Sequence, residues 1–178
     1  MDSRTRVLLQ RTSLIAIAEY HNDVIASLKI YFSDSAARSN ERFIGYTSQQ
    51  RATELAFRVE ETDLRSALSV LTSLEASFRL DYEYRCRKRM KDSLSRTFRG
   101  LEKVRKRYVS LDDDIFENWS KQVTGAGRLI SELRAAFRFR HWLAHGHYWD
   151  PKLGKRYDFN TVYSLAEAVL NNLTLLKV

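Results

Sequence analysis

The chain has 178 residues, of which 44% are hydrophobic and 29% charged, and 30 Lys and Arg against 22 Asp and Glu give it a formal net charge of +8. This length suits one hydrophobic core and is short for two, so we predict a single domain over residues 1–178. One proline and six glycines argue against a many-turned β architecture, and the apolar content argues against disorder. We therefore expect an all-α protein.

The number of cysteines and the length of the apolar runs indicate in which cellular compartment we expect the protein. Cys86 is the single cysteine, so neither an internal disulfide nor a cysteine-based zinc site is expected. The apolar runs are short and interrupted by charges, and no apolar signal core follows Met1. We expect a cytoplasmic protein that does not enter a membrane.

Apolar residues recur at helical intervals along most of the chain and predict a bundle of about five to seven helices. The Ser-, Asn- and Gly-rich segment 33–48 is predicted to be a loop, and 148–154 a turn or short hairpin. The expected helices cover residues 5–32, 49–89, 93–108, a short stretch after 110, 127–145 and 160–177.

Several residues are suited to begin or end these helices. Thr62 or Asp63 is placed to break the second helix, and Ser110 begins a Ser-x-x-Asp capping pattern. Gly146 is predicted to end the helix that contains the histidines, and Asn160 to cap the last helix.

The positive charge is concentrated in one segment. Residues 79–107 hold twelve basic and four acidic residues, so this segment accounts for the whole excess of the chain. A local cationic surface attracts polyanions without regard to their sequence, and nucleic acid is the first candidate.

The helix expected at 93–108 separates its charges from its apolar residues. At about 100° per residue, one face gathers Leu94, Phe98, Leu101 and Tyr108, and the opposite face gathers Arg96, Arg99, Lys103 and Arg107. The apolar face is expected to pack, and the basic residues are expected to bind RNA. An ordinary solvated face is the alternative.

Three of the four histidines, His141, His145 and His147, lie within seven residues, beside Arg138 and Arg140. Arginine presents a planar fork of donors to phosphate oxygens, and histidine exchanges protons near neutral pH. Together they supply what cleavage of an RNA phosphodiester by its own 2′-hydroxyl requires, without a metal or another cofactor.

The run Phe137-Arg138-Phe139-Arg140-His141-Trp142-Leu143-Ala144-His145-Gly146 resembles the signature of the HEPN superfamily: an Arg, a polar residue, three further residues and a His. The segment 75–99 also resembles bacterial ribonuclease-type members. The resemblance implies a helical bundle that homodimerises to form an RNA-cleaving cleft, and many relatives are toxins or antiviral effectors, which suggests an antitoxin or regulatory partner. By position, Arg140 would bind the scissile phosphate, His145 would be the general acid or base, and His141 the supporting polar residue.

The spacing leaves other pairings open. Arg138 with His145 and Arg140 with His147 also satisfy the looser pattern, so Arg138 and His147 are expected to contact RNA. On an ideal helix Arg138, His141 and His145 lie within about 60° of one another, whereas Arg140 points roughly 140° away from His145. Arg140 then falls among apolar residues, where it requires a partner in its own chain or in a second subunit.

The alternative interpretations of these residues are structural. His141 and His145 are also typical of a helix C-terminus, and with His147 their spacing would suit a metal, although no HExxH motif is present. Aromatic residues near the motif are expected either to stack on bases or to pack in a core or interface: Trp142, Tyr148, Trp149 and Tyr157.

His21 is expected at the surface. The rival function is a non-catalytic RNA- or nucleotide-binding or scaffold subunit, and a DNA-binding regulator is a weaker third.

Overall fold

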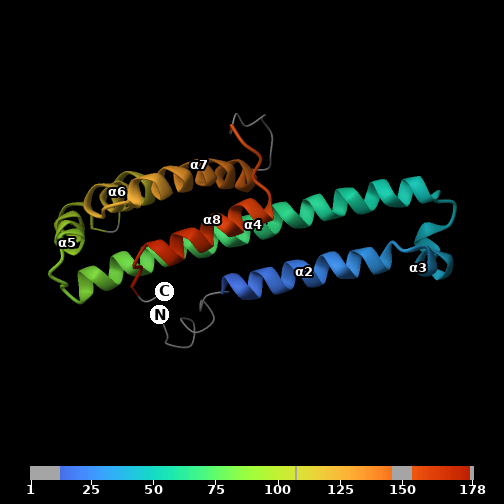
Figure 1. The fold of residues 1–178 in the computed structure, drawn as a ribbon, viewed down its shortest axis with the longest axis horizontal. Coiled ribbons are helices and arrows are strands. Elements are labelled where there is room, and N and C mark those ends of the chain that lie inside the picture. The colour runs from blue at the N-terminus through green and yellow to red at the C-terminus, as the bar shows by residue number, and fades with distance from the viewer. Residues whose placement is uncertain (1–12, 107, 146–153, 177–178) are drawn as a thin grey trace. The chain divides into compact units, whose positions relative to one another are not determined.

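The computed structural model describes residues 13–106, 108–145 and 154–176, and these residues form seven α-helices, a 3-10 helix and a π-helix, with no strand among them. The predicted all-α class with about five to seven helices is confirmed. The chain forms two compact units, an N-terminal unit of Met1–Ser69 and a C-terminal unit of Val70–Val178. Helix α4 (Ser48–Arg87) contributes residues to both units (Figure 1).

The N-terminal unit pairs α2 (Leu14–Tyr31) with the first part of α4, and Figure 1 shows the two helices side by side. The Ser13 hydroxyl caps α2 by accepting a hydrogen bond from the Ala16 N–H at 3.1 Å. Of the helix predicted over residues 5–32, the part before residue 13 lies outside the described residues.

The segment 33–48 is not a plain loop, and that prediction was wrong. It contains α3 (Asp34–Ser39) and the 3-10 helix η1 (Glu41–Phe43). Ser33 and Asn40 use their side chains as N-caps, because the Ser33 hydroxyl accepts from the Ala36 N–H and the Asn40 side chain from the Arg42 N–H. The same local hydrogen bonding that suggested a loop therefore begins two short helices.

His21 is buried, which corrects the expectation that it lies at the surface. Its Nδ1 lies 3.1 Å from the Ser66 hydroxyl and its Nε2 lies 3.4 Å from an Asp63 carboxylate oxygen. Both partners come from α4, so His21 joins the two helices of the N-terminal unit.

Helix α4 runs for 40 residues without the break predicted near Thr62 or Asp63. The Thr62 hydroxyl donates to the Arg58 carbonyl at 2.8 Å inside the helix instead of capping a new one. Arg58 and Arg65 both pair with Glu61 across the predicted break, and such pairs support a helix. No helix in the described part of the chain is both long and apolar enough to cross a membrane.

The C-terminal unit adds α5 (Ser93–Arg105), the π-helix η2 (Leu111–Phe116), α6 (Glu117–Gln122), α7 (Ala126–Ala144) and α8 (Phe159–Asn172) to the second part of α4. Helix α6 contacts α5, η2 and α7, and α7 contacts α8. Three buried rings centre this core, with Phe78 5.0 Å from Phe116 and 6.0 Å from Trp119 between centroids.

The predicted caps have mixed outcomes. The Ser110 hydroxyl accepts from the Asp113 N–H at 3.1 Å, which confirms the Ser-x-x-Asp pattern. Asn160 does not cap α8, because Asp158 accepts from the Thr161 N–H at 2.8 Å and starts the helix at Phe159. This last helix ends at Asn172, earlier than the expected end at residue 177.

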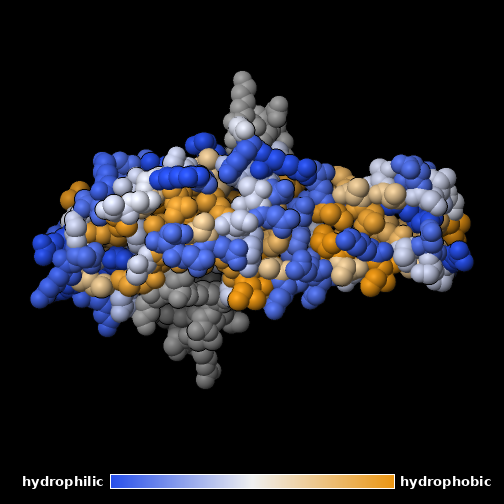
Figure 2. Space-filling model, viewed as in Figure 1, coloured by the Kyte–Doolittle hydropathy of each residue, from blue (hydrophilic) through white to orange (hydrophobic). Residues whose placement is uncertain are grey.

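Large apolar side chains remain exposed on the N-terminal unit. They lie on α2, the α3 to α4 connection and the start of α4. Figure 2 shows hydrophobic surface, in orange, over this part of the molecule. The exposed residues are Ile15, Tyr20, Ile30, Tyr31, Ile44, Tyr46 and Phe57. A pair of helices has no second layer against which to bury such residues by itself.

Candidate functional site

The C-terminal end of α7 brings two of the predicted site residues into contact. His141 and His145 are four residues apart, and their ring centroids lie 4.2 Å from each other with an interplanar angle of 55°. Both side chains are exposed. His145 is the C-cap residue, and its backbone N–H bonds to the His141 carbonyl at 3.1 Å. Gly146, the predicted end of this helix, lies outside the described residues.

Arg140 is held on a different side of α7. Its Nη2 lies 2.9 Å from a carboxylate oxygen of Glu75 on α4, and its guanidinium lies 5.9 Å from the centroid of the Phe137 ring. The side chain is one-third exposed, at 33%. The partner that Arg140 was expected to need is therefore Glu75 of the same chain, and the ion pair directs this guanidinium toward α4.

Arg138 is exposed, and within the described residues no ion pair involves it. It precedes His145 by seven residues, or about two helical turns, so both side chains lie on one face of α7. Arg134, one turn earlier on that face, is occupied by Asp112 and by Glu117, whose carboxylate lies 2.7 Å from Arg134 Nη2. Of the two described arginines on this face of α7, Arg138 is therefore the one without an ion pair.

The aromatic residues around the motif are mainly packed. Phe139 stacks on Trp142 at 5.8 Å and on Tyr157 at 5.3 Å between centroids. Tyr157 is buried, so it packs in the core, while Trp142 is half-buried. Tyr148, Trp149 and His147 lie outside the described residues.

The basic face predicted on the third helix is only partly realised. Arg96 and Lys103 are exposed on α5, while Arg99 is half-buried and donates to the Met90 carbonyl at 2.6 Å. Arg107 lies outside the described residues. Tyr108 is 71% exposed and is not buried on the apolar face as expected, because α5 already ends at Arg105 and Lys106 turns the backbone with a φ of 54°.

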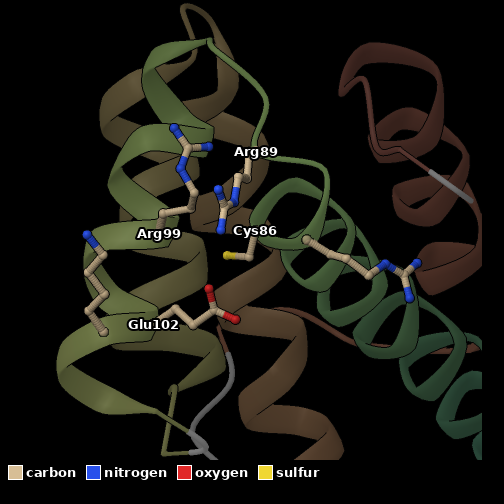
Figure 3. Close-up of a pocket in the computed structure, with 6 residues that line it drawn as sticks. Cys86, Arg89, Arg99 and Glu102 are labelled. Carbon is tan, nitrogen blue, oxygen red and sulfur yellow. The ribbon is translucent and has the colours of Figure 1, made fainter.

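Sequence reasoning missed a hollow of about 530 Å³ where α4 ends and α5 begins. Figure 3 shows Arg89 and Arg99 beside each other above the Cys86 sulfur, with the Glu102 carboxylate on the other side of the sulfur. The lining residues are Cys86, Arg87, Arg89, Arg99, Glu102 and Lys103. The density of basic residues at 85–91 signalled the charge, but the turn that gathers it around Cys86 has no sequence signature.

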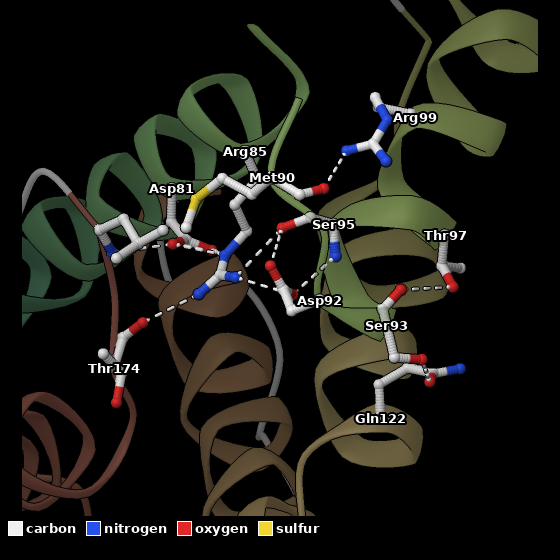
Figure 4. A network of polar contacts seen from close by, with 11 residues as sticks. Asp81, Arg85, Met90, Asp92, Ser93, Ser95, Thr97, Arg99, Gln122 and Thr174 are labelled. Atoms are coloured by element: carbon white, nitrogen blue, oxygen red, sulfur yellow. Dashed lines mark hydrogen bonds and ion pairs between the residues drawn. The ribbon is translucent and has the colours of Figure 1, made fainter. Parts of the chain in front are cut away.

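A buried polar network stands next to this hollow and holds the turn between α4 and α5 (Figure 4). Arg85 Nε lies 2.8 Å and 2.9 Å from the two carboxylate oxygens of Asp81. Its other nitrogens donate to Asp92 and Ser95, which begin α5, and to the Thr174 carbonyl after α8. The network therefore joins three segments that are distant in sequence.

A Ser–His–Asp arrangement also occurs in the N-terminal unit, where His21 lies between Ser66 and Asp63. The triad order alone would suggest a nucleophilic hydrolase. Ser66 and His21 are both buried, with 5% and 7% of their surface exposed, so a substrate cannot reach the Ser66 hydroxyl in this structure. We interpret the arrangement as a structural contact between α2 and α4.

No group of three or more His, Cys, Asp or Glu side chains among the described residues is placed to hold a metal ion. The spacing of His141, His145 and His147 remains untested as a metal site, because His147 is not described. Comparisons with protein-family models, with curated proteins and with solved structures find no match to this chain. The function therefore has to be argued from the residues themselves.

Proposed function

We propose that the protein is a metal-independent endoribonuclease whose site is the C-terminal end of α7. The observation that supports this proposal is the contact between the exposed imidazoles of His141 and His145, 4.2 Å apart at the end of a helix. Imidazoles exchange protons near neutral pH, and their exposure lets an RNA strand approach. Arg138 adds a permanent positive charge on the same face.

The proposed reaction is an internal transesterification. The 2′-hydroxyl oxygen bonds to the adjacent phosphorus while the bond from phosphorus to the 5′-oxygen breaks, which leaves a 2′,3′-cyclic phosphate and a 5′-hydroxyl. His145 takes the proton from the 2′-hydroxyl and returns a proton to the departing 5′-oxygen. His141 orients the His145 ring through their contact, and an arginine stabilises the charge on the phosphate oxygens.

Two arginines are candidates for the phosphate. Arg140 occupies the motif position, but a substrate phosphate would have to displace Glu75 to engage it. Arg138 is exposed and needs no displacement. Within one chain the geometry favours Arg138, and in a homodimer Arg140 can contribute to a cleft shared by two subunits.

The rival proposal is a non-catalytic RNA-binding or scaffold subunit. The ion pair between Arg140 and Glu75 favours it, since a motif arginine used to join α7 to α4 has a structural role. A toxin or defence role, a cytoplasmic location and a neutralising partner protein belong to the ribonuclease proposal.

Cleavage assays with the full-length protein separate the two proposals. Total RNA and a labelled oligoribonucleotide are incubated in excess EDTA, beside a DNA strand and an oligonucleotide with a single 2′-deoxy residue at the cut. We expect cleavage of RNA only, and His145→Ala should lose about two to four decades of rate. Arg128→Ala is the matched control, because Arg128 lies on the same helix, is 90% exposed and pairs with Glu132.

The arginine variants then rank the phosphate ligands. If Arg138 holds the phosphate, Arg138→Ala should lower the cleavage rate about a hundredfold. Arg140→Ala should lower the rate less, and only to the extent that losing the ion pair with Glu75 destabilises the protein. The reverse ranking at unchanged stability would assign the phosphate to Arg140. Protein that binds RNA and never cuts it, with or without metal, contradicts the ribonuclease proposal and supports the scaffold.

A further inference from the structure

The hollow at the α4–α5 turn concentrates cations that have no counter-ions. Arg87, Arg89, Arg99 and Lys103 line it, and Glu102 is the acidic residue among the described lining side chains. Among the residues that the structure describes, none of these five side chains takes part in an ion pair. Most of the other described arginines are ion-paired, as Arg79 is with Glu75. A concave group of unpaired cations is typical of an anion-binding site.

The backbone at this turn is arranged to hold one of the arginines in place. Arg89 has a φ of 50°, a left-handed conformation that glycine usually provides at the end of a helix. A non-glycine residue in this conformation carries a steric cost, and such costs are concentrated at functional positions. In Figure 3 this conformation directs the Arg89 side chain over Cys86 beside Arg99.

Two further contacts keep the hollow preformed. Arg99 donates one hydrogen bond to the Met90 carbonyl at 2.6 Å, which leaves the other N–H groups of its fork for a ligand. The Arg85 network holds Asp92 and Ser95 at the start of α5, directly after this turn (Figure 4). The base of the hollow does not repel an anion, because burial raises the pKa of the Cys86 thiol to about 11 and the thiol stays neutral.

We infer that this hollow binds an anion with clustered phosphates, such as the di- or triphosphate group of a nucleotide, with Arg89 and Arg99 holding the phosphates together. Four cations and one carboxylate leave a net charge of about three, which matches clustered phosphates better than the single charge of one RNA phosphodiester. The volume of about 530 Å³ falls in the range of small-ligand sites. The inference goes beyond the ribonuclease proposal: the hollow shares Arg99 and Lys103 with the proposed RNA-binding face of α5, but it contains no residue of α7 and does not depend on the cleavage site.

Calorimetry with the full-length protein tests the inference. The three ligands are ATP, inorganic phosphate and a single-stranded RNA decamer without terminal phosphates. We expect ATP to bind at micromolar concentration, phosphate far more weakly, and the decamer to compete poorly. Arg89→Gly is the sharpest variant, because glycine suits the left-handed backbone and should leave the melting temperature unchanged or raised while ATP binding falls about tenfold or more.

Two matched variants complete the test. Arg96→Gln removes an exposed cation from the same helix outside the hollow and should leave ATP affinity within about twofold. Glu102→Gln removes the only carboxylate and should tighten ATP binding about threefold or more. The inference is overturned if ATP does not bind at millimolar concentration. It is also overturned if Arg96→Gln and Arg89→Gly lower the affinity for ATP equally, or if the decamer binds as tightly as ATP.

Discussion

Arg85 shows how much one buried side chain can hold together. Its side chain is 8% exposed and it contacts α4, α5 and the residues after α8. Asp81, its partner, is fully buried, and burial raises the pKa of Asp81 although Leu176 N–H and Arg85 both act to lower it. The buried Asp81 carboxylate is stable in its charged form only while the Arg85 guanidinium pairs with it.

Arg85→Met should therefore destabilise the protein by about 3–5 kcal/mol, because it leaves the Asp81 carboxylate buried and unpaired. Urea denaturation followed by circular dichroism measures the free energy of unfolding. Arg96→Met, at an exposed position, should change it by less than about 0.5 kcal/mol. A loss below about 1 kcal/mol for Arg85→Met would show that the network is dispensable.

His21 makes the N-terminal unit sensitive to pH. Burial lowers the pKa of His21, and the nearby Asp63 carboxylate opposes this only in part. Near pH 6.5 the imidazole of His21 therefore binds a proton more readily in the unfolded chain than in the folded one. The contribution of neutral His21 to the free energy of unfolding is fully present above about pH 6.5. It is lost as the pH falls from there toward the lower pKa of His21 in the folded state.

Hydrogen exchange of the N-terminal unit at pH 7.5 and 5.5, corrected for intrinsic rates, should accordingly show weaker protection at the lower pH. His21→Gln cannot be protonated, so the difference between the two pH values should shrink in that variant. Equal pH dependence in both proteins would assign the effect to other groups.

At the scale of the element, α5 separates a buried face from a charged one. Leu94, Ser95 and Phe98 are buried, and Arg96 and Lys103 are exposed on the outside of the same helix. RNA binding by such a face rests on phosphate contacts and counterion release, so it depends on salt and not on base sequence.

Replacing Arg96, Arg99 and Lys103 together by Gln should weaken RNA binding and reduce the slope of log affinity against log salt by about 0.7 for each lost contact. Fluorescence anisotropy with a single-stranded oligoribonucleotide measures both quantities. Cleavage of bound RNA should persist, because the histidines on α7 are unchanged. If affinity and slope equal those of Arg128→Gln, the basic face of α5 is merely solvated.

At the scale of the whole molecule, the exposed apolar side chains of the N-terminal unit favour self-association. A two-fold dimer presents the same surface twice, so exposed residues on α2 and near α3 can pack against their own copies. If Arg140 is the phosphate ligand, the ribonuclease proposal also needs a second copy of the motif, since Arg140 and His145 lie on different sides of α7.

We therefore predict a two-fold homodimer. Light scattering at micromolar concentration should give twice the mass of the chain, and Ile30→Asp with Ile44→Asp should give monomers of unchanged helicity, because these side chains are 70% and 80% exposed. Leu80→Asp is the matched control, an exposed apolar residue of the C-terminal unit. A wild-type monomer with full cleavage activity would exclude the shared cleft.

Local patterns in the sequence were sufficient for the class and for several helices. Apolar periodicity predicted the all-α class, and the bounds of α5 and α7 agree with the predicted ranges to within three residues. The Ser110 cap was predictable because its hydrogen bond joins residues three positions apart. The contact between His141 and His145 likewise follows from their spacing on one helix.

The sequence by itself determined what depends on neighbours within a turn or two of helix: helix formation, the Ser110 cap, the local excess of charge and the pairing of the two histidines. Tertiary structure alone decided what depends on residues far apart in the chain. Burial of His21, the engagement of Arg140 by Glu75 and the gathering of Arg89 and Arg99 around Cys86 are such features. The physical reason is that burial and ion pairing depend on which helices pack together, and no local period encodes that.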